Sequence, residues 1–289
     1  MGGRRAAVLI AGPTASGKSA LALALAAEGD AVIVNADAMQ VYDTLAVVTA
    51  RPGAADLAGA EHRLYGTAPA GERFSTGRWL EAVGAVINET AGRKLIFVGG
   101  TGLYFDALIH GFAEIPPVPA EIALAVEEEV QALDGAERLA LLQREDPDTA
   151  ARLKVADPQR VIRALAVKRA TGRTISSFQD APQAGMLDFW TIERVVLDPD
   201  RAVLRQRIAR RFEAMFEGGA VAEVEALLQQ GLDASLPAMK AIGVPEISAW
   251  LEGRITREEA LRLAITATHQ YAKRQRTWFG NRMGDWPRQ

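Results

Sequence analysis

Cysteine is absent from the 289 residues of this chain. The absence excludes disulfide bonds, thiolate metal sites and a cysteine nucleophile. Long hydrophobic runs are missing as well: no stretch of about 18 apolar residues occurs, so we expect no membrane-spanning helix. The apolar stretch near the N-terminus is short and leads directly into a glycine-rich loop, unlike a signal peptide. Together these absences indicate a cytoplasmic protein.

An overall excess of basic charge is also lacking, because the net charge is −3 at pH 7. The basic residues are nevertheless clustered. Residues 151–173 hold seven basic side chains and one acidic one, residues 201–211 hold five arginines and no acid, and residues 269–289 hold five basic side chains and one aspartate. Such clusters favour a phosphate-rich partner, although solvated helix faces give the same pattern.

The segment GPTASGKS matches the phosphate-loop pattern G-x-x-x-x-G-K-[ST] and lies between an apolar run, 6–12, and a helix-favouring run, 19–29. Its glycines allow the backbone N–H groups to curl around an anion. The lysine adds a mobile positive charge, and the following helix directs its positive end at the phosphates. We therefore expect a diphosphate group to bind to Gly12, Pro13, Thr14, Ala15, Ser16, Gly17, Lys18 and Ser19, with the Ser19 hydroxyl as a ligand of Mg²⁺.

Strand and helix signals alternate along the first third of the chain, which predicts a doubly wound α/β fold with a parallel sheet, as in P-loop proteins. The expected strands lie in the runs 6–12, 31–37 and 94–102 and end at Gly12, Asn35 and Val98. The expected helices are 19–29, 75–93 and 103–111. A proline-rich segment at 114–121 then marks a boundary. Only helical signals follow it, up to a segment at 189–198 whose sequence is again typical of a β-strand. We expect an α/β core of residues 1–113 and 190–289, interrupted by an all-helical insertion of residues 114–189.

Two polar residues follow expected strands at the edge where parallel sheets bind their ligands. Asp37 comes directly after the second strand, and a carboxylate there accepts a proton or holds Mg²⁺, or else it caps a turn. Thr101 stands between glycines after the third strand, where its hydroxyl contacts a ligand or caps the backbone. That strand ends in glycines rather than in the Mg²⁺-binding aspartate of nucleotide hydrolases, which argues against ordinary ATP hydrolysis.

Six segments occur in a familiar order: GPTASGKS, NADAMQVYD, EHRLYG, VGGTGLYFDALIHG, DPQRVIRALAVKRATG and HQYAKRQRTWF. With them the chain resembles the tRNA isopentenyltransferase family, in its shorter bacterial form, from about residue 6 to residue 280. The resemblance implies transfer of a dimethylallyl group from dimethylallyl diphosphate to N6 of adenosine 37 in tRNAs that read UNN codons. Pyrophosphate would be the leaving group, so the loop would hold a diphosphate that departs from carbon.

The resemblance also implies roles for individual residues. Asp37 would accept the proton from N6, and Arg211, with Arg207 as second choice, would reach the pyrophosphate. Thr14 and Thr101 would contact the diphosphate, and Mg²⁺ on Ser19 would help to neutralise it. The expected partners are the tRNA anticodon stem-loop and dimethylallyl diphosphate, bound by a monomer. The expected tRNA contacts are Asp37, Ala38, Met39, Gln40, Gln159, Arg160, Val161, Ile162, Arg163, Lys240 and Arg274.

Three positions depart from the family pattern. Val244-Pro245 stands where Tyr-Arg or Tyr-Lys is expected, Val48 replaces a glycine, and Ala123 replaces an arginine. These departures concern RNA contacts more than the diphosphate site. Three alternatives remain open at this point: a P-loop small-molecule kinase, a nucleotide-dependent RNA-binding switch, and an enzyme that prenylates free adenine nucleotides.

Overall fold

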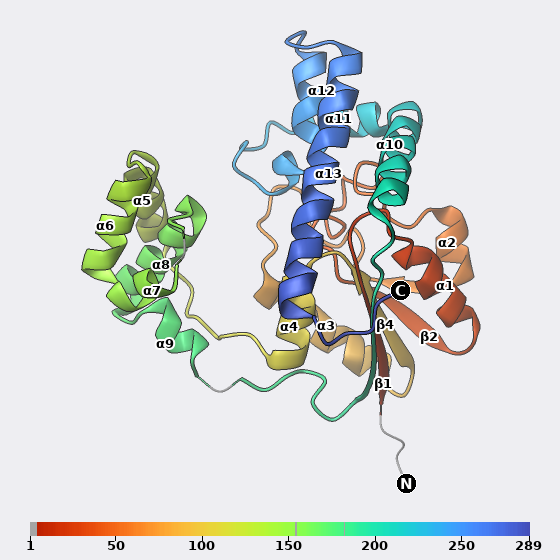
Figure 1. The fold of residues 1–289 in the computed structure, drawn as a ribbon, viewed down its shortest axis with the longest axis horizontal. Coiled ribbons are helices and arrows are strands. Elements are labelled where there is room, and N and C mark those ends of the chain that lie inside the picture. The colour runs from red at the N-terminus through yellow and green to blue at the C-terminus, as the bar shows by residue number, and fades with distance from the viewer. Residues whose placement is uncertain (1–4, 154, 182) are drawn as a thin grey trace. The chain divides into compact units, whose positions relative to one another are not determined.

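Five short segments of this chain form one sheet in a computed structural model, which describes residues 5–153, 155–181 and 183–289. The strands are β1 (Ala6–Ala11), β2 (Ala31–Asn35), β3 (Glu61–Arg63), β4 (Lys94–Gly99) and β5 (Thr191–Val196). Their order is β3-β2-β4-β1-β5, and every neighbouring pair is parallel (Figure 1). The expected α/β fold is therefore confirmed, and the carboxyl ends of the central strands meet at one edge.

Helices cover both faces of this sheet, as the apolar runs of the central strands require. α1 (Lys18–Ala27) packs on one face, where Ala22 and Ala26 contact alternate side chains of β1, β2 and β4. α3 (Thr76–Glu89) and α4 (Gly102–His110) pack on the other face, around the fully buried Trp79. Ser75 caps the start of α3, because its hydroxyl accepts a hydrogen bond from Arg78 N at 3.2 Å.

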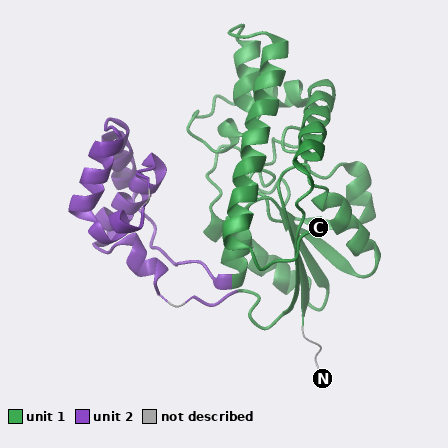
Figure 2. Cartoon of the chain, in the orientation of Figure 1, with its two compact units in different colours: residues 1–109, 186–289 green, residues 110–185 purple. Residues whose placement is uncertain are grey.

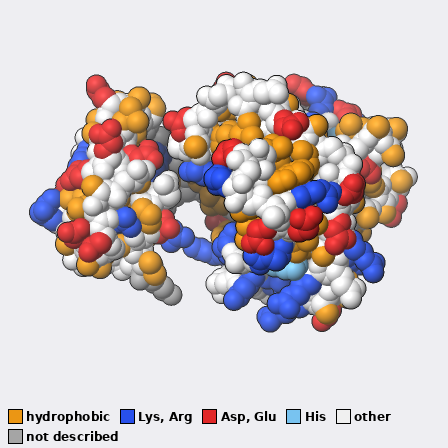
Figure 3. Space-filling model, turned by 90° about the horizontal axis from the view of Figure 1, so that it is seen from above, with side chains coloured by type: hydrophobic (Ala, Val, Ile, Leu, Met, Phe, Trp, Pro, Cys, Tyr) orange, Lys and Arg blue, Asp and Glu red, His pale blue; other side chains and the backbone are white. Residues whose placement is uncertain are grey.

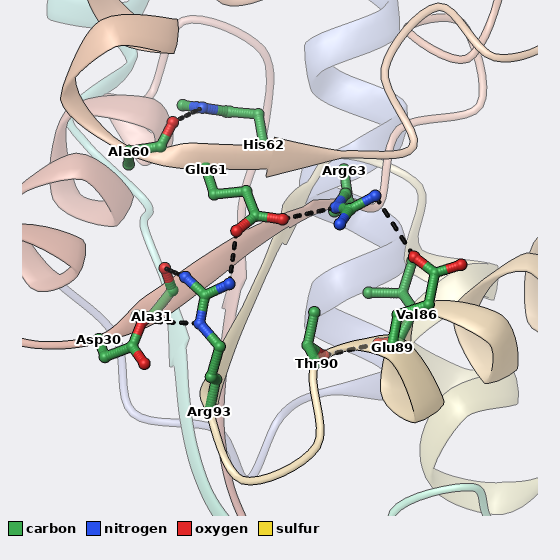
Figure 4. A network of polar contacts seen from close by, with 10 residues as sticks. All are labelled: Asp30, Ala31, Ala60, Glu61, His62, Arg63, Val86, Glu89, Thr90 and Arg93. Atoms are coloured by element: carbon green, nitrogen blue, oxygen red, sulfur yellow. Dashed lines mark hydrogen bonds and ion pairs between the residues drawn. The ribbon is translucent and has the colours of Figure 1, made fainter.

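The edge strand β3 was not expected from the sequence, because its three residues, Glu-His-Arg, carry no apolar run. It follows the short helix α2 (Ala54–Gly59) and is held by ion pairs (Figure 4). Arg93 bonds both Asp30 and Glu61, and the Glu61 carboxylate also pairs with Arg63 at 2.7 Å. These arginines hold the pKa of Glu61 below its usual value. Charged side chains of this kind also protect an open sheet edge from pairing with another chain.

A second helical layer follows β5. It consists of α10 (Arg201–Glu217), α11 (Ala220–Leu228), the 3-10 turn η1 (Ala238–Lys240), α12 (Val244–Leu251) and the long α13 (Arg257–Arg282). Its core contains Phe212, Phe216 and Val224 and extends to the loop after β2. The far end of α13 belongs to a different core, because Phe279 packs among the side chains beneath the sheet. α13 therefore passes from the helical layer to the sheet, across the edge where the strands end.

The chain divides into two compact units (Figure 2), Met1–Ile109 with Met186–Gln289, and His110–Gly185. The boundaries expected at 114 and 189 lie four residues later than these. The second unit contains α5 (Ala120–Gln131), α6 (Gly135–Glu145), α7 (Pro147–Arg152), α8 (Pro158–Thr171) and α9 (Ile175–Gln179). The side chains of Asp146 and Asp157 cap α7 and α8, each directly before the proline that opens the helix. No helix among the described residues combines the length and apolar character needed to cross a membrane.

Candidate active site

The phosphate loop connects β1 to α1 and is shaped by left-handed backbone positions. Ala15 has φ of 64° and Gly17 has φ of 100°, and such alternation turns successive N–H groups toward one concave face. Gly12 has φ of 156°, and a Cβ atom there would lie 2.6 Å from the Leu197 carbonyl oxygen, so only glycine fits. The loop therefore forms the expected anion cradle at the positive end of α1.

Two cations converge on this cradle. Lys18 Nζ donates to the Pro13 carbonyl at 2.6 Å, and Arg211 of α10 donates to the Thr14 hydroxyl. Burial lowers the pKa of Lys18 to about 8, a shift that Asp37 opposes and Arg211 reinforces. Burial also lowers the pKa of Arg211, again opposed by Asp37. Two cations held together in a poorly solvated site favour a bound anion.

Two buried polar atoms in the cradle make no hydrogen bond to the described residues. They are Arg211 Nε and Ser16 Oγ. Unpaired buried donors are uncommon and costly in folded proteins. Ser16 belongs to the phosphate loop, and Arg211 of α10 contacts the loop through Thr14, so both atoms lie beside the cradle.

A cavity of about 490 Å³ opens onto the cradle. The phosphate loop forms one wall, and Arg207 and Arg211 of α10 contribute further positive charge. Asp37 is the carboxylate in this lining, and the Gln40 and Tyr65 side chains complete it. The cavity thus combines an anion site with one potential proton acceptor.

A second cavity of about 310 Å³ adjoins the first. Thr14, Asp37, Thr49 and Arg211 line both of them. The walls of the second cavity are mostly apolar, and basic residues stand at its rim. Its other lining residues include Ala38, Met39, Val48, Phe212, Met215, Ile242, Tyr271, Lys240 and Arg274. A flat aromatic ring suits these walls, and it would meet the contents of the first cavity beside Asp37 and Arg211.

The orientation of Asp37 is fixed by its neighbours. The fully buried Asn35 side chain accepts from Asp37 N at 2.8 Å and donates to the Asp37 carbonyl at 3.0 Å. Trp79 Nε1 in turn donates to the Asn35 carbonyl at 2.8 Å. Asp37 Oδ1 accepts from Met39 N at 3.0 Å, whereas Oδ2 has no hydrogen bond to any residue that the structure describes. Asp37 therefore presents one free carboxylate oxygen, and sequence reasoning missed Asn35 although a polar residue at the end of a buried strand could have indicated it.

Gln275 of α13 is a second residue that sequence reasoning missed. Its Oε1 accepts from Thr14 N at 2.9 Å, and its Nε2 donates to the Gly100 carbonyl at 2.9 Å. The side chain is 5% exposed. A Cβ atom at Gly100 would overlap Gln275 Nε2, and one at Gly102 would overlap the Trp278 ring, so these glycines allow α13 to lie directly on the loop. Gln275 therefore links the phosphate loop to the loop after β4.

Of the remaining expected site residues in the larger unit, some line the cavities and one does not. The Thr101 hydroxyl accepts from Ala38 N at 2.9 Å, which supports the loop after β2, and Thr101 lines neither cavity. Gln40 Nε2 donates to the Thr49 and Ala50 carbonyls, so its amide already holds the wall of the first cavity. Lys240 and Arg274 both line the second cavity.

One expected contact in the helical unit is corrected by the structure. Val161 is completely buried in the core of that unit and cannot reach an RNA, because α8 turns this position inward. Gln159, Arg160 and Arg163 are exposed, and Ile162 is partly buried against the same core. The exposed residues of the segment remain candidates for RNA contact.

The protein oxygen atoms at this site are too few to bind Mg²⁺ alone, but they can bind it together with a phosphate ligand. No group of three or more His, Asp or Glu side chains among the described residues converges as a metal-binding set. Ser19 and Asp37 line the first cavity and supply one hydroxyl and one carboxylate. Mg²⁺ commonly takes its other ligands from substrate phosphates and water, so this small donor set suits it.

Comparisons with known proteins agree with this geometry. A family model described as IPP transferase matches residues 40–282, and one described as isopentenyl transferase matches residues 5–70. A tRNA dimethylallyltransferase of Chelativorans sp. (strain BNC1) is 51% identical over 286 residues, which cover 98% of each chain. A protein of the same name from Methylobacterium sp. (strain 4-46) is also 51% identical, covering 98% of this chain and 93% of the relative.

Solved structures share the fold. The tRNA isopentenylpyrophosphate transferase of Bacillus halodurans is similar with a TM-score of 0.69 at 30% identity, covering 99% of this chain and 90% of that one. A eukaryotic dimethylallyltransferase acting on tRNA is similar with a TM-score of 0.80 at 25% identity, covering 95% of this chain and 70% of that one. The similarity thus extends over both units of the chain.

Proposed function

This chain belongs to the IPP transferase family and has tRNA dimethylallyltransferase activity at N6 of adenosine 37; from this premise we propose which of its residues carry the reaction. The first cavity takes the diphosphate of dimethylallyl diphosphate, and the second takes the adenine. The observation that carries the assignment is that the two cavities meet at Asp37 and Arg211. Donor carbon and acceptor nitrogen would therefore face each other there.

Catalysis must help the leaving group, because the lone pair of an adenine amine is delocalised into the ring. In the proposed reaction a bond forms between N6 and the allylic carbon while the bond from that carbon to the diphosphate oxygen breaks. The loop amides, Lys18 and Arg211 stabilise the negative charge that develops on pyrophosphate. Mg²⁺, bound with the diphosphate near Ser19, would supply further positive charge there. Arg211 Nε and Ser16 Oγ, which make no hydrogen bond to the described residues, belong to residues that line the cavity proposed for this leaving group.

The proton of N6 goes to Asp37 in this scheme. Its free Oδ2 is the acceptor, while Oδ1 and the backbone remain bonded to Met39 and Asn35. The adenine leaves the anticodon loop and enters the apolar second cavity, where Phe212 and Tyr271 offer ring contacts. Thr101 acts as a positioning residue through Ala38 rather than by touching the diphosphate.

The RNA backbone is assigned to basic residues outside the two cavities. Lys240 and Arg274 stand at the rim through which the base would enter. We assign the exposed Gln159, Arg160 and Arg163 of the helical unit to the anticodon stem-loop. Selection of tRNAs that read UNN codons, a monomeric state and a cytoplasmic location belong to the same proposal.

The reaction is tested by product analysis. The enzyme is incubated with dimethylallyl diphosphate, Mg²⁺ and an unmodified anticodon stem-loop, and the RNA is digested to nucleosides. Prenylated adenosine is the expected product, and pyrophosphate is released in equal amount. ATP consumption without prenylation would instead support the P-loop kinase, while prenylation of AMP in preference to RNA would support an enzyme for free nucleotides.

We expect the use of dimethylallyl diphosphate to depend on the charge of Lys18. Its pKa is about 8 in the free enzyme, so the cation that binds the diphosphate is lost as the pH rises through this value. The ratio kcat/KM for dimethylallyl diphosphate should therefore be level below pH 8 and fall about tenfold per pH unit above it, because this ratio reports the free enzyme.

The matched control is Lys18→Arg, whose guanidinium keeps its charge over the same range. This variant should have lower activity but no decline above pH 8. A decline of the same size in both enzymes would assign it to another group and contradict the prediction. At saturating dimethylallyl diphosphate the decline in kcat should move to higher pH, because the bound anion favours the charged lysine.

We expect the loss of the two Gln275 hydrogen bonds to impair the positioning of both the dimethylallyl diphosphate and the adenine. In Gln275→Leu, Thr14 N and the Gly100 carbonyl would remain buried without partners, and the two loops would be free to separate. A displacement of about 1 Å between reacting groups costs roughly 10²-fold in rate. We expect kcat to fall by roughly 10–100-fold and the KM for dimethylallyl diphosphate to rise, measured by steady-state kinetics.

The control for this variant is Gln230→Leu, at an exposed position after α11. A purely structural effect of Gln275→Leu would reduce the fraction of active enzyme, and so lower kcat, without changing either KM. Wild-type values for both KM constants would therefore disprove the positioning role of Gln275.

A further inference from the structure

A groove between α10 and α13 is not used by the reaction described above. It has a volume of about 600 Å³ and shares no lining residue with the two cavities of the active site. Its floor is formed by Leu204, Ile208 and Ala272, and Ala15 of the phosphate loop packs against the same cluster. The groove therefore lies next to the active site, separated from it by one layer of side chains.

The groove is strongly basic. It is lined by Arg201, Arg205, Lys273, Arg276 and Arg288, with His269 beside them and Asp198 as the carboxylate of the lining. Asp198 pairs with Arg276 at 2.8 Å and with Arg288 at 3.3 Å. Figure 3 shows Lys and Arg side chains gathered on the surface of the larger unit.

Three of these cations have no partner among the described residues. The side chains of Arg201, Arg205 and Lys273 make no hydrogen bond or ion pair with the residues that the structure describes. One further donor atom, Arg276 Nη1, is buried without a hydrogen-bond partner. The nearby carboxylate of Asp200 is occupied, because it accepts from the amides of Ala202 and Val203 at the start of α10. Like charges crowded without compensation create a positive potential that attracts an anion.

The spacing of the cations suits an extended anion. Lys273 and Arg276 are three positions apart on α13, which corresponds to roughly 4.5 Å along a helix, and Arg201 and Arg205 are about 6 Å apart along α10. A single diphosphate would be matched by a compact cluster such as that of the phosphate loop. A row of charges on two helices instead matches consecutive phosphates of a nucleic-acid backbone.

The position of the groove on α13 also favours RNA. Tyr271 and Arg274 line the adenine cavity on one flank of this helix, and Lys273 and Arg276 line the groove on another. An α-helix with its side chains is about 10–12 Å across, which is narrower than an RNA stem. An RNA whose base enters the second cavity can therefore extend over α13 to the groove.

We propose that the groove between α10 and α13 binds the ribose–phosphate backbone of the tRNA at nucleotides away from the reacting adenosine. This proposal rests on the tRNA acceptor assigned above and adds a surface to it that includes α10. Contacts of this kind fix the position of the RNA and strengthen its binding without reading its sequence. The groove takes no part in the transfer of the dimethylallyl group.

The test uses Arg201→Gln/Arg205→Gln, a double variant at two exposed positions. The dissociation constant of full-length unmodified tRNA is measured by fluorescence anisotropy at several salt concentrations, together with kcat and the KM for dimethylallyl diphosphate. Each lost phosphate contact reduces the slope of log K against log salt by about 1. We expect the slope to fall by about 2 and tRNA binding to weaken roughly tenfold near 0.1 M salt, with kcat unchanged.

The control is Arg254→Gln/Arg262→Gln, which removes the same charge from exposed arginines paired with Glu252 and Glu259 away from the groove. It should leave the salt slope near the wild-type value. An equal loss in both double variants would indicate only a net-charge effect and overturn the proposal. A higher KM for dimethylallyl diphosphate with unchanged tRNA binding would instead assign the groove to the diphosphate. Because kcat is measured in the same variants, loss of prenylation itself would be distinguished from loss of RNA binding.

Discussion

Replacing Asp37 by asparagine should lower kcat by roughly 10²–10⁴-fold, the usual contribution of a general base. The asparagine side chain has the same shape, and its amide oxygen can still accept from Met39 N, so the turn after β2 is retained. The backbone bonds to Asn35 do not involve the substituted group. What is lost is the carboxylate proton acceptor of a residue that lines both cavities.

The measurement is single-turnover prenylation of an anticodon stem-loop, with RNA binding measured separately. Asp37→Asn should bind RNA and dimethylallyl diphosphate with affinities near those of the wild type. Asp43→Asn provides the control, since Asp43 is an exposed carboxylate nearby that bonds the Thr44 hydroxyl. Wild-type kcat in Asp37→Asn would remove Asp37 from the mechanism and leave water or pyrophosphate as the proton acceptor.

Removal of the Arg211 guanidinium should have an effect of similar size on the donor side. Arg211→Met keeps a long apolar side chain beside Thr14 but deletes the cation and its unpaired Nε. Loss of one group that stabilises a developing anion costs roughly 10²–10³-fold in kcat. We expect kcat/KM for dimethylallyl diphosphate to fall at least as much, because the same group also binds the ground-state diphosphate.

Arg210 supplies the matched control, because it precedes Arg211 on α10 and is exposed. Arg210→Met should retain wild-type kinetics, and Arg211→Lys should recover part of the activity, since it restores the charge but not the planar fork. Arg211→Met with an unchanged kcat/KM for dimethylallyl diphosphate would show that the leaving group is held without this residue.

Sequence reasoning predicted the elements whose signals are local. The phosphate loop and the strands at β1, β2 and β4 each depend on a few neighbouring residues, and they were confirmed. Asp37 was found because it directly follows a strand end, and the resemblance to a known family indicated Arg211. The structure places both around one point where two cavities meet.

The features that escaped prediction depend on contacts across the chain. Gln275 lies 261 residues from Thr14, and its bond to that residue has no local pattern in the sequence. β3 consists of polar residues and becomes a strand only because the backbone of β2 is available beside it. The family resemblance placed Val161 among the RNA contacts, yet the helical period turns it into the core.

The junction of the two cavities has a consequence for water. Allylic carbon that loses pyrophosphate is readily attacked by any nucleophile, and water is the most abundant one. Because Thr14, Thr49, Asp37 and Arg211 line both spaces, an adenine seated in the second cavity, as proposed, would cover the carbon held in the first. The acceptor base would thereby shield the donor from hydrolysis, so that ionisation would be most productive once the RNA has arrived.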